Sequence, residues 1–147
     1  MNNQVVSASR VIQASPAEVF SVLSDASLHH AIDGSGMVRG TKGTPERLEL
    51  GSRFGMKMRM GIPYGITNEV VEFEQDRRIA WAHFGGHRWR YELEEVDGGT
   101  LVTESFDWST AISPKAIERM GYPQKHVANM ERTLEKLEAF VLNRRHG

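Results

Sequence analysis

The chain has 147 residues, of which 39% are hydrophobic and 25% are charged, and its formal net charge is −1. This composition is ordinary for one soluble globular domain, and it lacks the basic stripe that nucleic-acid binding requires. There is no apolar run long enough for a membrane span and no signal-peptide pattern, and the absence of cysteine excludes disulfides and thiolate metal sites. We therefore expect a single cytoplasmic domain over residues 1–147.

The N-terminal part predicts one strand and two short helices. Residues 5–13 form the expected strand, and SPAEVFSVLSD then begins a helix. Ser15 is the expected N-cap, Pro16 takes the first helical position, and Glu18 completes a capping box. A second helix, ASLHHAI, is expected to end at the glycine loop DGSG over residues 33–36.

The segment from Met37 to Ser109 predicts antiparallel strands joined by hairpins, and a long helix follows from about Pro123. Apolar residues of that helix recur at spacings of three and four, which indicates one buried stripe. The stripe covers barely two heptads, so we expect a helix lying on a sheet rather than a coiled coil. Its members are Val127, Met130, Leu134, Leu137 and Val141.

The strand HRWRYELEEV divides its side chains between an aromatic face and a charged face. On the charged face, Arg90 is expected to meet Asp107 in a solvated surface of little energetic value. A three-residue loop over 84–86 would set Trp81 opposite Trp89 on the aromatic face. It would also set His83 opposite His87 and Ile79 opposite Tyr91.

The neighbouring hairpins extend this register. A five-residue loop over 74–78 would place Phe73 against Ile79, and a turn at Gly98–Gly99 would place Trp89 against Trp108. Three rows result on one face: Val71, Trp81, Trp89 and Trp108; Phe73, Ile79, Tyr91 and Phe106; and a polar row of Glu69, His83, His87 and Thr110.

The segments VIQASPAEVFSVLSD, DGSG, VVEFEQDRRIAW and FDWS resemble those of the START, polyketide-cyclase and plant-allergen superfamily, in its bacterial polyketide cyclase/dehydrase-like branch. The resemblance covers essentially the whole chain. It implies an α+β helix-grip fold. In that fold a curved antiparallel sheet, two short N-terminal helices and a long C-terminal helix enclose a hydrophobic cavity.

Two interpretations of the aromatic face remain open. Aromatic residues dominate ordinary cores, but tryptophan and tyrosine also carry polar groups that a ligand cavity could satisfy. Methionines of the strand GSRFGMKMRMG suit either a core or an adaptable pocket. The expected ligand-binding residues are Met56, Met58, Met60, Val71, Trp81, Trp89, Tyr91, Glu104, Phe106 and Trp108.

Glu69, His83 and His87 are candidate catalytic residues, because a carboxylate that orients an imidazole suits proton transfer beside a carbonyl. They could equally line the mouth of the cavity without reacting. We expect neither a metal site nor a cofactor.

The expected function is binding or transport of a small, largely apolar, aromatic or lipid-like molecule. The alternatives are a polyketide cyclase, aromatase or dehydratase, and a chaperone-cofactor-like interaction module.

Overall fold

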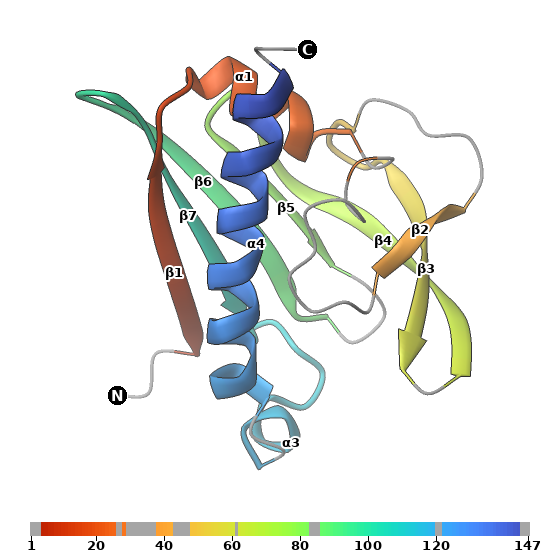
Figure 1. Ribbon diagram of the computed structural model, residues 1–147. Helices are drawn as coiled ribbons and strands as arrows, with labels where there is room; N and C mark the ends of the chain where they lie inside the picture. The colour runs from red at the N-terminus through yellow and green to blue at the C-terminus, as the bar shows by residue number, and fades with distance from the viewer. Residues whose placement is uncertain are drawn as a thin grey trace.

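The computed structural model describes residues 4–25, 28, 38–42, 48–60, 62–82, 86–119 and 122–144, with the backbone alone for 38–42, 54–60, 62–66, 116–117, 119 and 122–125. The strands form one antiparallel seven-stranded sheet in the order β1-β7-β6-β5-β4-β3-β2, with α4 across one face (Figure 1). The bounds are β1 Val5–Ile12, β2 Val38–Lys42, β3 Arg53–Met60, β4 Ile62–Glu74, β5 Arg78–Ala82, β6 Arg88–Val96 and β7 Gly99–Asp107. The α+β antiparallel architecture is the one predicted.

Helix α1, Pro16–Leu23, begins as the sequence predicts. The Ser15 hydroxyl accepts a hydrogen bond from the Glu18 amide, and Glu18 Oε1 accepts one from the Ser15 amide, each 3.2 Å long. This reciprocal capping box satisfies two amide donors that have no partner within the helix. The helix buries Val19, Phe20, Val22 and Leu23.

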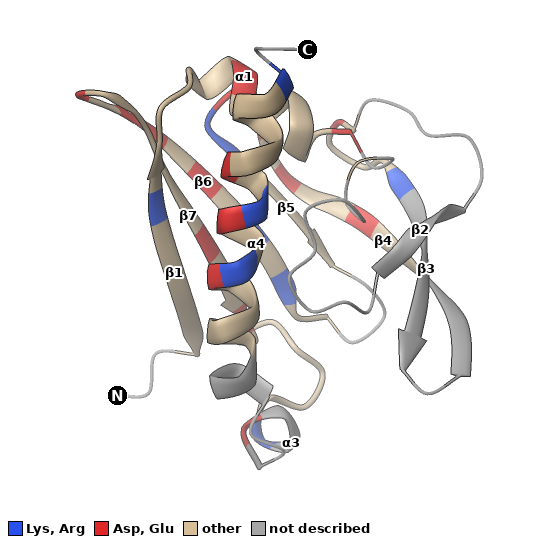
Figure 2. Cartoon of the chain, in the orientation of Figure 1, with Lys and Arg blue, Asp and Glu red and all other residues tan. Residues whose placement is uncertain are grey.

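Helix α4, Tyr122–Arg144, lies along the sheet against β1 and β7 (Figure 1). Its predicted stripe is the face that packs: Met130, Leu134, Leu137 and Val141 are buried, and Val127 is partly buried beside them. Its charged residues lie on the side away from the sheet (Figure 2), and Glu138 bonds to Arg10 of β1 at 2.9 Å. Among the described helices, none has a stretch long and apolar enough to cross a membrane.

The helices differ from the prediction in one respect. A short helix, α3 (Pro114–Arg119), precedes α4, and the prediction did not include it. The predicted second N-terminal helix, ASLHHAI, lies outside the described residues except for Leu28, as does the DGSG loop.

The hairpin of β5 and β6 has the predicted register. Ile79 pairs with Tyr91 and Trp81 pairs with Trp89. These residues belong to the face of the sheet toward α1 and α4, which we call the inner face. His83 and residues 84–85 of the expected loop lie outside the described residues, so the pairing of His83 with His87 stays a prediction.

The predicted pairing of β4 with β5 is correct at one end and wrong at the other. Phe73 pairs with Ile79 as expected, but a β-bulge between Val70 and Glu72 shifts the rest by one residue. Val70 therefore lies opposite Trp81, and Glu69 opposite Ala82. Val71 is the extra residue of the bulge and does not join the aromatic row.

The predicted pairing of β6 with β7 is wrong by two residues. The turn is Asp97–Gly98, so Val96 pairs with Gly99, and Trp89 lies opposite Phe106 rather than Trp108. A glycine is required just after this turn for a reason outside the hairpin. A Cβ on Gly99 would lie 2.0 Å from the carbonyl oxygen of Ile12, at the end of β1. The two-residue shift leaves every side chain on the face predicted for it.

Candidate functional site on the inner face

An aromatic wall runs across the middle of the inner face. Val70, Trp81, Trp89 and Phe106 are successive partners on β4, β5, β6 and β7. The Trp89 ring contacts the Phe106 ring at 4.8 Å between centroids, and Trp81 contacts Tyr91 of the next row at 5.6 Å. Trp81, Tyr91 and Phe106 are buried, whereas Trp89 is half-buried. The wall therefore crosses four strands that follow one another along the chain.

Trp108 is on the inner face but lies one step beyond this row. Its ring stacks on Phe106 at 5.9 Å, and its indole Nε1 donates a 3.0 Å hydrogen bond to Glu118 of α3. Met130 of α4 belongs to the same buried cluster. The polar tip of Trp108 is thus satisfied within the protein.

A buried polar pair interrupts the second row. Tyr91 lies opposite Glu104, and the Tyr91 hydroxyl donates a 3.0 Å hydrogen bond to Glu104 Oε2. Each residue is only 4% exposed. Carboxyl groups are seldom buried to this extent because their transfer out of water costs free energy. Glu104 is among the predicted ligand-binding residues, but the predicted register placed Phe106 in the row of Tyr91, where the structure has Glu104.

Two members of the predicted polar row, Glu69 and Thr110, do not lie where the prediction placed them, and a third, His83, lies outside the described residues. Because of the bulge, Glu69 faces away from the aromatic wall, where it forms an exposed 3.0 Å ion pair with Arg53. Asn68 takes the inner-face position instead and is 2% exposed. Thr110 is exposed and donates a hydrogen bond of 2.7 Å to the carbonyl of Gly86. The structure therefore does not bring Glu69 together with His87.

Two histidines contact Phe106. His87 lies at 5.1 Å and His126 of α4 at 4.5 Å, measured between ring centroids. His126 also meets Trp89 edge-on at 4.8 Å. Burial lowers the pKa of His126 from 6.5 to about 4, so its imidazole is neutral at physiological pH. His87 was among the predicted site residues, whereas His126, which lies four residues before Met130 on the same side of α4, was not.

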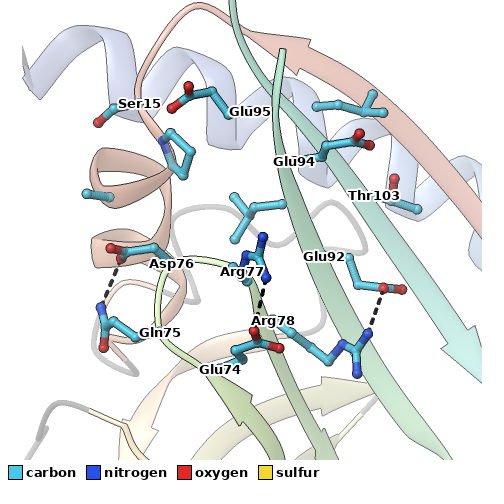
Figure 3. A pocket seen from close by; sticks show the side chains of 14 residues that line it. Ser15, Glu74, Gln75, Asp76, Arg77, Arg78, Glu92, Glu94, Glu95 and Thr103 are labelled. Carbon is cyan, nitrogen blue, oxygen red and sulfur yellow. Dashed lines mark hydrogen bonds and ion pairs between the residues drawn. The ribbon is translucent and has the colours of Figure 1, made fainter.

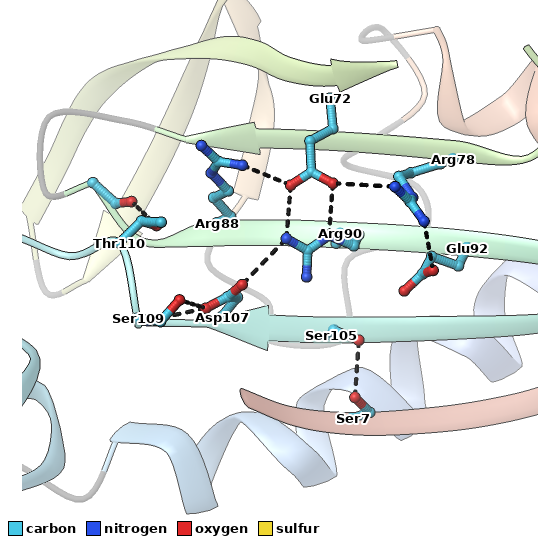
Figure 4. A network of polar contacts seen from close by, with 11 residues as sticks. Ser7, Glu72, Arg78, Arg88, Arg90, Glu92, Ser105, Asp107, Ser109 and Thr110 are labelled. Atoms are coloured by element: carbon cyan, nitrogen blue, oxygen red, sulfur yellow. Dashed lines mark hydrogen bonds and ion pairs between the residues drawn. The ribbon is translucent and has the colours of Figure 1, made fainter. Parts of the chain in front are cut away.

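The opposite face of the sheet carries a charge network (Figure 4). Glu72 accepts hydrogen bonds from Arg88 at 2.8 Å and from Arg90 at 2.6 Å, and Arg90 also bonds to Asp107 at 3.2 Å. The pairing of Arg90 with Asp107 was predicted, but the prediction placed it in a solvated surface. The side chains of Arg90, Glu72 and Asp107 are only 16%, 18% and 11% exposed, so the network is half-buried rather than solvated.

A crevice of about 960 Å³ lies at the other end of the sheet, between the start of α1, the β4–β5 turn and the β6–β7 hairpin (Figure 3). Its lining includes two ion pairs of 3.3 Å each, Arg77 with Glu74 and Arg78 with Glu92. It is an open, charged surface away from the aromatic wall, and we do not assign the expected ligand to it.

The remaining candidates are Met56, Met58 and Met60. They belong to β3, of which residues 54–60 are described by backbone alone, so their part in a pocket stays a prediction. Across the described ranges of the chain, no three His, Asp or Glu side chains gather in a way that could hold a metal ion.

A curved antiparallel sheet with a long C-terminal helix across its inner face defines a helix-grip domain. The chain belongs to the family described as polyketide cyclase / dehydrase and lipid transport, which it matches over residues 3–141. The superfamily that the sequence motifs resemble is therefore confirmed.

Two curated relatives and two solved structures are similar to this chain. The uncharacterized proteins Rv0088 and MT0096 of Mycobacterium tuberculosis are 39% and 38% identical to this chain over alignments of 138 residues, with 90% of this chain covered. The chain spans 62% of the length of these curated relatives. Protein NE0264 of Nitrosomonas europaea has a TM-score of 0.76 at 15% identity, covering 100% of this chain and 99% of that one. The AHSA1-like protein of Aeromonas hydrophila has a TM-score of 0.62 at 20% identity, with 92% of each chain covered. At these identities, the two structures show the fold alone.

Proposed function

We propose that this chain binds a small, largely apolar, ring-containing molecule against the aromatic wall of its inner face. The observation that carries the proposal is the polar pair of Tyr91 and Glu104, buried beside Trp81 and Trp89. A dry core gains little from a carboxyl group, because burial of that group opposes folding. A binding site gains selectivity from a few polar groups placed in an apolar wall.

The family description includes both lipid transport and cyclase or dehydrase chemistry. Ligand binding is common to both. The catalytic alternative needed Glu69 beside the two histidines, and Glu69 instead pairs with Arg53. Binding is therefore the function that the described geometry supports best, and no described contact favours the interaction-module alternative.

The test compares two ligand classes in wild-type protein and in Trp89→Leu. The probes are 1-aminoanthracene, which is flat and polycyclic, and tetradecanoic acid, which is saturated. Stacking on an aromatic ring contributes about 0.5–1.5 kcal/mol beyond area burial, so Trp89→Leu should weaken the first probe by that amount and the second much less. Calorimetric titration measures both affinities.

Trp108→Leu is the matched control, because the Trp108 indole already bonds to Glu118 and packs with Met130. This variant should change neither affinity by as much as Trp89→Leu does. Equal losses for both probes in Trp89→Leu would show a plain hydrophobic wall. If neither probe binds wild-type protein, the aromatic wall has only a packing role in the core, and the proposal is overturned.

A further inference from the structure

Asn68 differs from the other buried polar residues in lacking a partner for its donor. Its side chain is buried, and within the described part of the chain the Nδ2 atom has no hydrogen-bond partner. By contrast, the buried hydroxyls of Ser24 and Thr100 donate to the carbonyls of Phe20 and Ala14 at 2.8 and 2.7 Å. Buried polar atoms are nearly always paired, so an unpaired donor needs a physical explanation.

The β-bulge explains how a carboxamide comes to lie there. Val70 lies opposite Trp81 on the inner face, and Asn68 is the next residue of β4 on that face. Without the bulge, the alternation set by Phe73 would turn Glu69 inward and Asn68 outward. Bulges commonly re-aim a side chain beside a functional site.

We propose that Asn68 determines ligand specificity by donating a hydrogen bond from Nδ2 to a carbonyl oxygen of the ring-containing ligand. This inference rests on the proposed function and names the chemical class of its ligand. An amide N–H₂ group only donates, so its partner must carry an acceptor. A ring ketone bound against Trp81 combines an aromatic face for the wall with an oxygen for Asn68. Water is the competing occupant of this position.

The test uses 9-fluorenone and fluorene, which share a flat tricyclic frame and differ by one carbonyl oxygen. Wild-type protein should bind fluorenone about 3- to 10-fold more tightly than fluorene, the value of one net hydrogen bond. Asn68→Leu should remove this difference by weakening fluorenone alone. Glu69→Gln is the matched control, because the neighbouring side chain faces the other way, and it should leave both affinities unchanged.

Two further measurements separate a ligand contact from a structural role. Replacing an unpaired buried donor by an apolar group of similar size is close to neutral, so the melting temperature of Asn68→Leu should equal or exceed that of wild type. Thr100→Val breaks a satisfied buried hydrogen bond and should lower it. In wild-type protein, fluorenone should move the proton signals of the Asn68 side-chain amide downfield as the hydrogen bond forms, beyond the ring-current shift that it shares with fluorene. The signals are assigned by their loss in Asn68→Asp.

Equal affinity of wild-type protein for the two probes would overturn the role of Asn68 and leave the proposed binding function intact. So would an amide signal that responds alike to both, which is the result expected if water occupies the position. A melting temperature for Asn68→Leu as low as that of Thr100→Val would assign Asn68 to the structure instead. Failure of both probes to bind would overturn the proposed function and this inference with it.

Discussion

The hydroxyl of Tyr91 and the carboxyl of Glu104 meet across β6 and β7 at 3.0 Å, and neither residue has appreciable contact with solvent. The pair is formed because the β6–β7 turn uses two residues, which brings Glu104 opposite Tyr91. A one-atom substitution is enough to test its contribution.

Tyr91→Phe removes the donor and leaves the ring in place. Removing one partner of a buried hydrogen bond costs about 1–3 kcal/mol, and we expect the free energy of unfolding to fall by that amount. Urea denaturation measures it. In the double variant Tyr91→Phe/Glu104→Leu, much of the loss should return, because both polar groups are then gone. A single-variant loss below about 0.5 kcal/mol would show that the bond contributes little.

The charge network centred on Glu72 should stabilise the sheet more than an exposed pair does. Glu72→Gln leaves Arg88 and Arg90 half-buried without their shared carboxylate, and we expect a loss of about 1–3 kcal/mol. Glu69→Gln is the same substitution in the pair with Arg53, whose side chains are 76% and 44% exposed, and it should cost less than about 1 kcal/mol. Comparable losses in the two variants would contradict a half-buried network.

His126 should make the protein less stable toward acidic pH. Burial lowers its pKa in the folded state to about 4, whereas the ordinary value is 6.5, so between these values the unfolded state binds more protons. Stability is therefore fully retained above pH 6.5 and falls as the pH drops toward 4. In His126→Gln this part of the pH dependence should disappear, as measured by urea midpoints at pH 7.5 and 5.0.

The charge network of Glu72 should not contribute to the pH dependence measured between pH 7.5 and 5.0. Hydrogen bonding from Arg90 lowers the pKa of Glu72 below the ordinary 4.5, so its contribution is present above pH 4.5 and is lost below it. Equal slopes between pH 7.5 and 5.0 in wild type and His126→Gln would show that the imidazole is solvated in the folded state.

Leu134→Ala tests the packing of α4 on the sheet. Leu134 is 1% exposed, and loss of a buried leucine side chain costs about 2–5 kcal/mol through lost transfer energy and the cavity left behind. The neighbouring Glu135→Ala, on the exposed side of the same turn, should change stability by less than about 0.5 kcal/mol. If the melting temperature of Leu134→Ala equals that of wild type, Leu134 does not pack against the sheet.

Local sequence signals were sufficient to predict the elements that have a clear helix cap or a clear apolar periodicity. Ser15 and Glu18 identified the start of α1, the stripe from Met130 to Val141 identified the buried face of α4, and bulky residues of one parity paired Trp81 with Trp89. In each of these elements, capping and periodicity agree with tertiary packing. The sequence Ser113–Pro114 before α3 repeats the start signal of α1, but the prediction did not use it.

The site was harder to predict because it depends on single-residue shifts. Both Val70 and Val71 are apolar, so either parity of β4 satisfies the core. A usable signal was present, since Glu69 and Glu72 cannot both face outward in a regular strand, and this conflict implies a bulge. Asp97, Gly98 and Gly99 similarly allow more than one turn. The close approach of Gly99 to β1, which selects the turn, is a tertiary contact.

Because Val71 is the extra residue of a bulge, β4 could lose it and become shorter while the same side chains continued to face inward. A relative that lacks this one residue would have a regular strand, with the counterparts of Phe73, Val70 and Asn68 still facing inward. Removal of Val71 would therefore alter the curvature of the sheet rather than the lining of the site. Gain or loss of one residue here is therefore a route by which evolution can reshape the volume beneath α4 without exchanging any side chain that faces it.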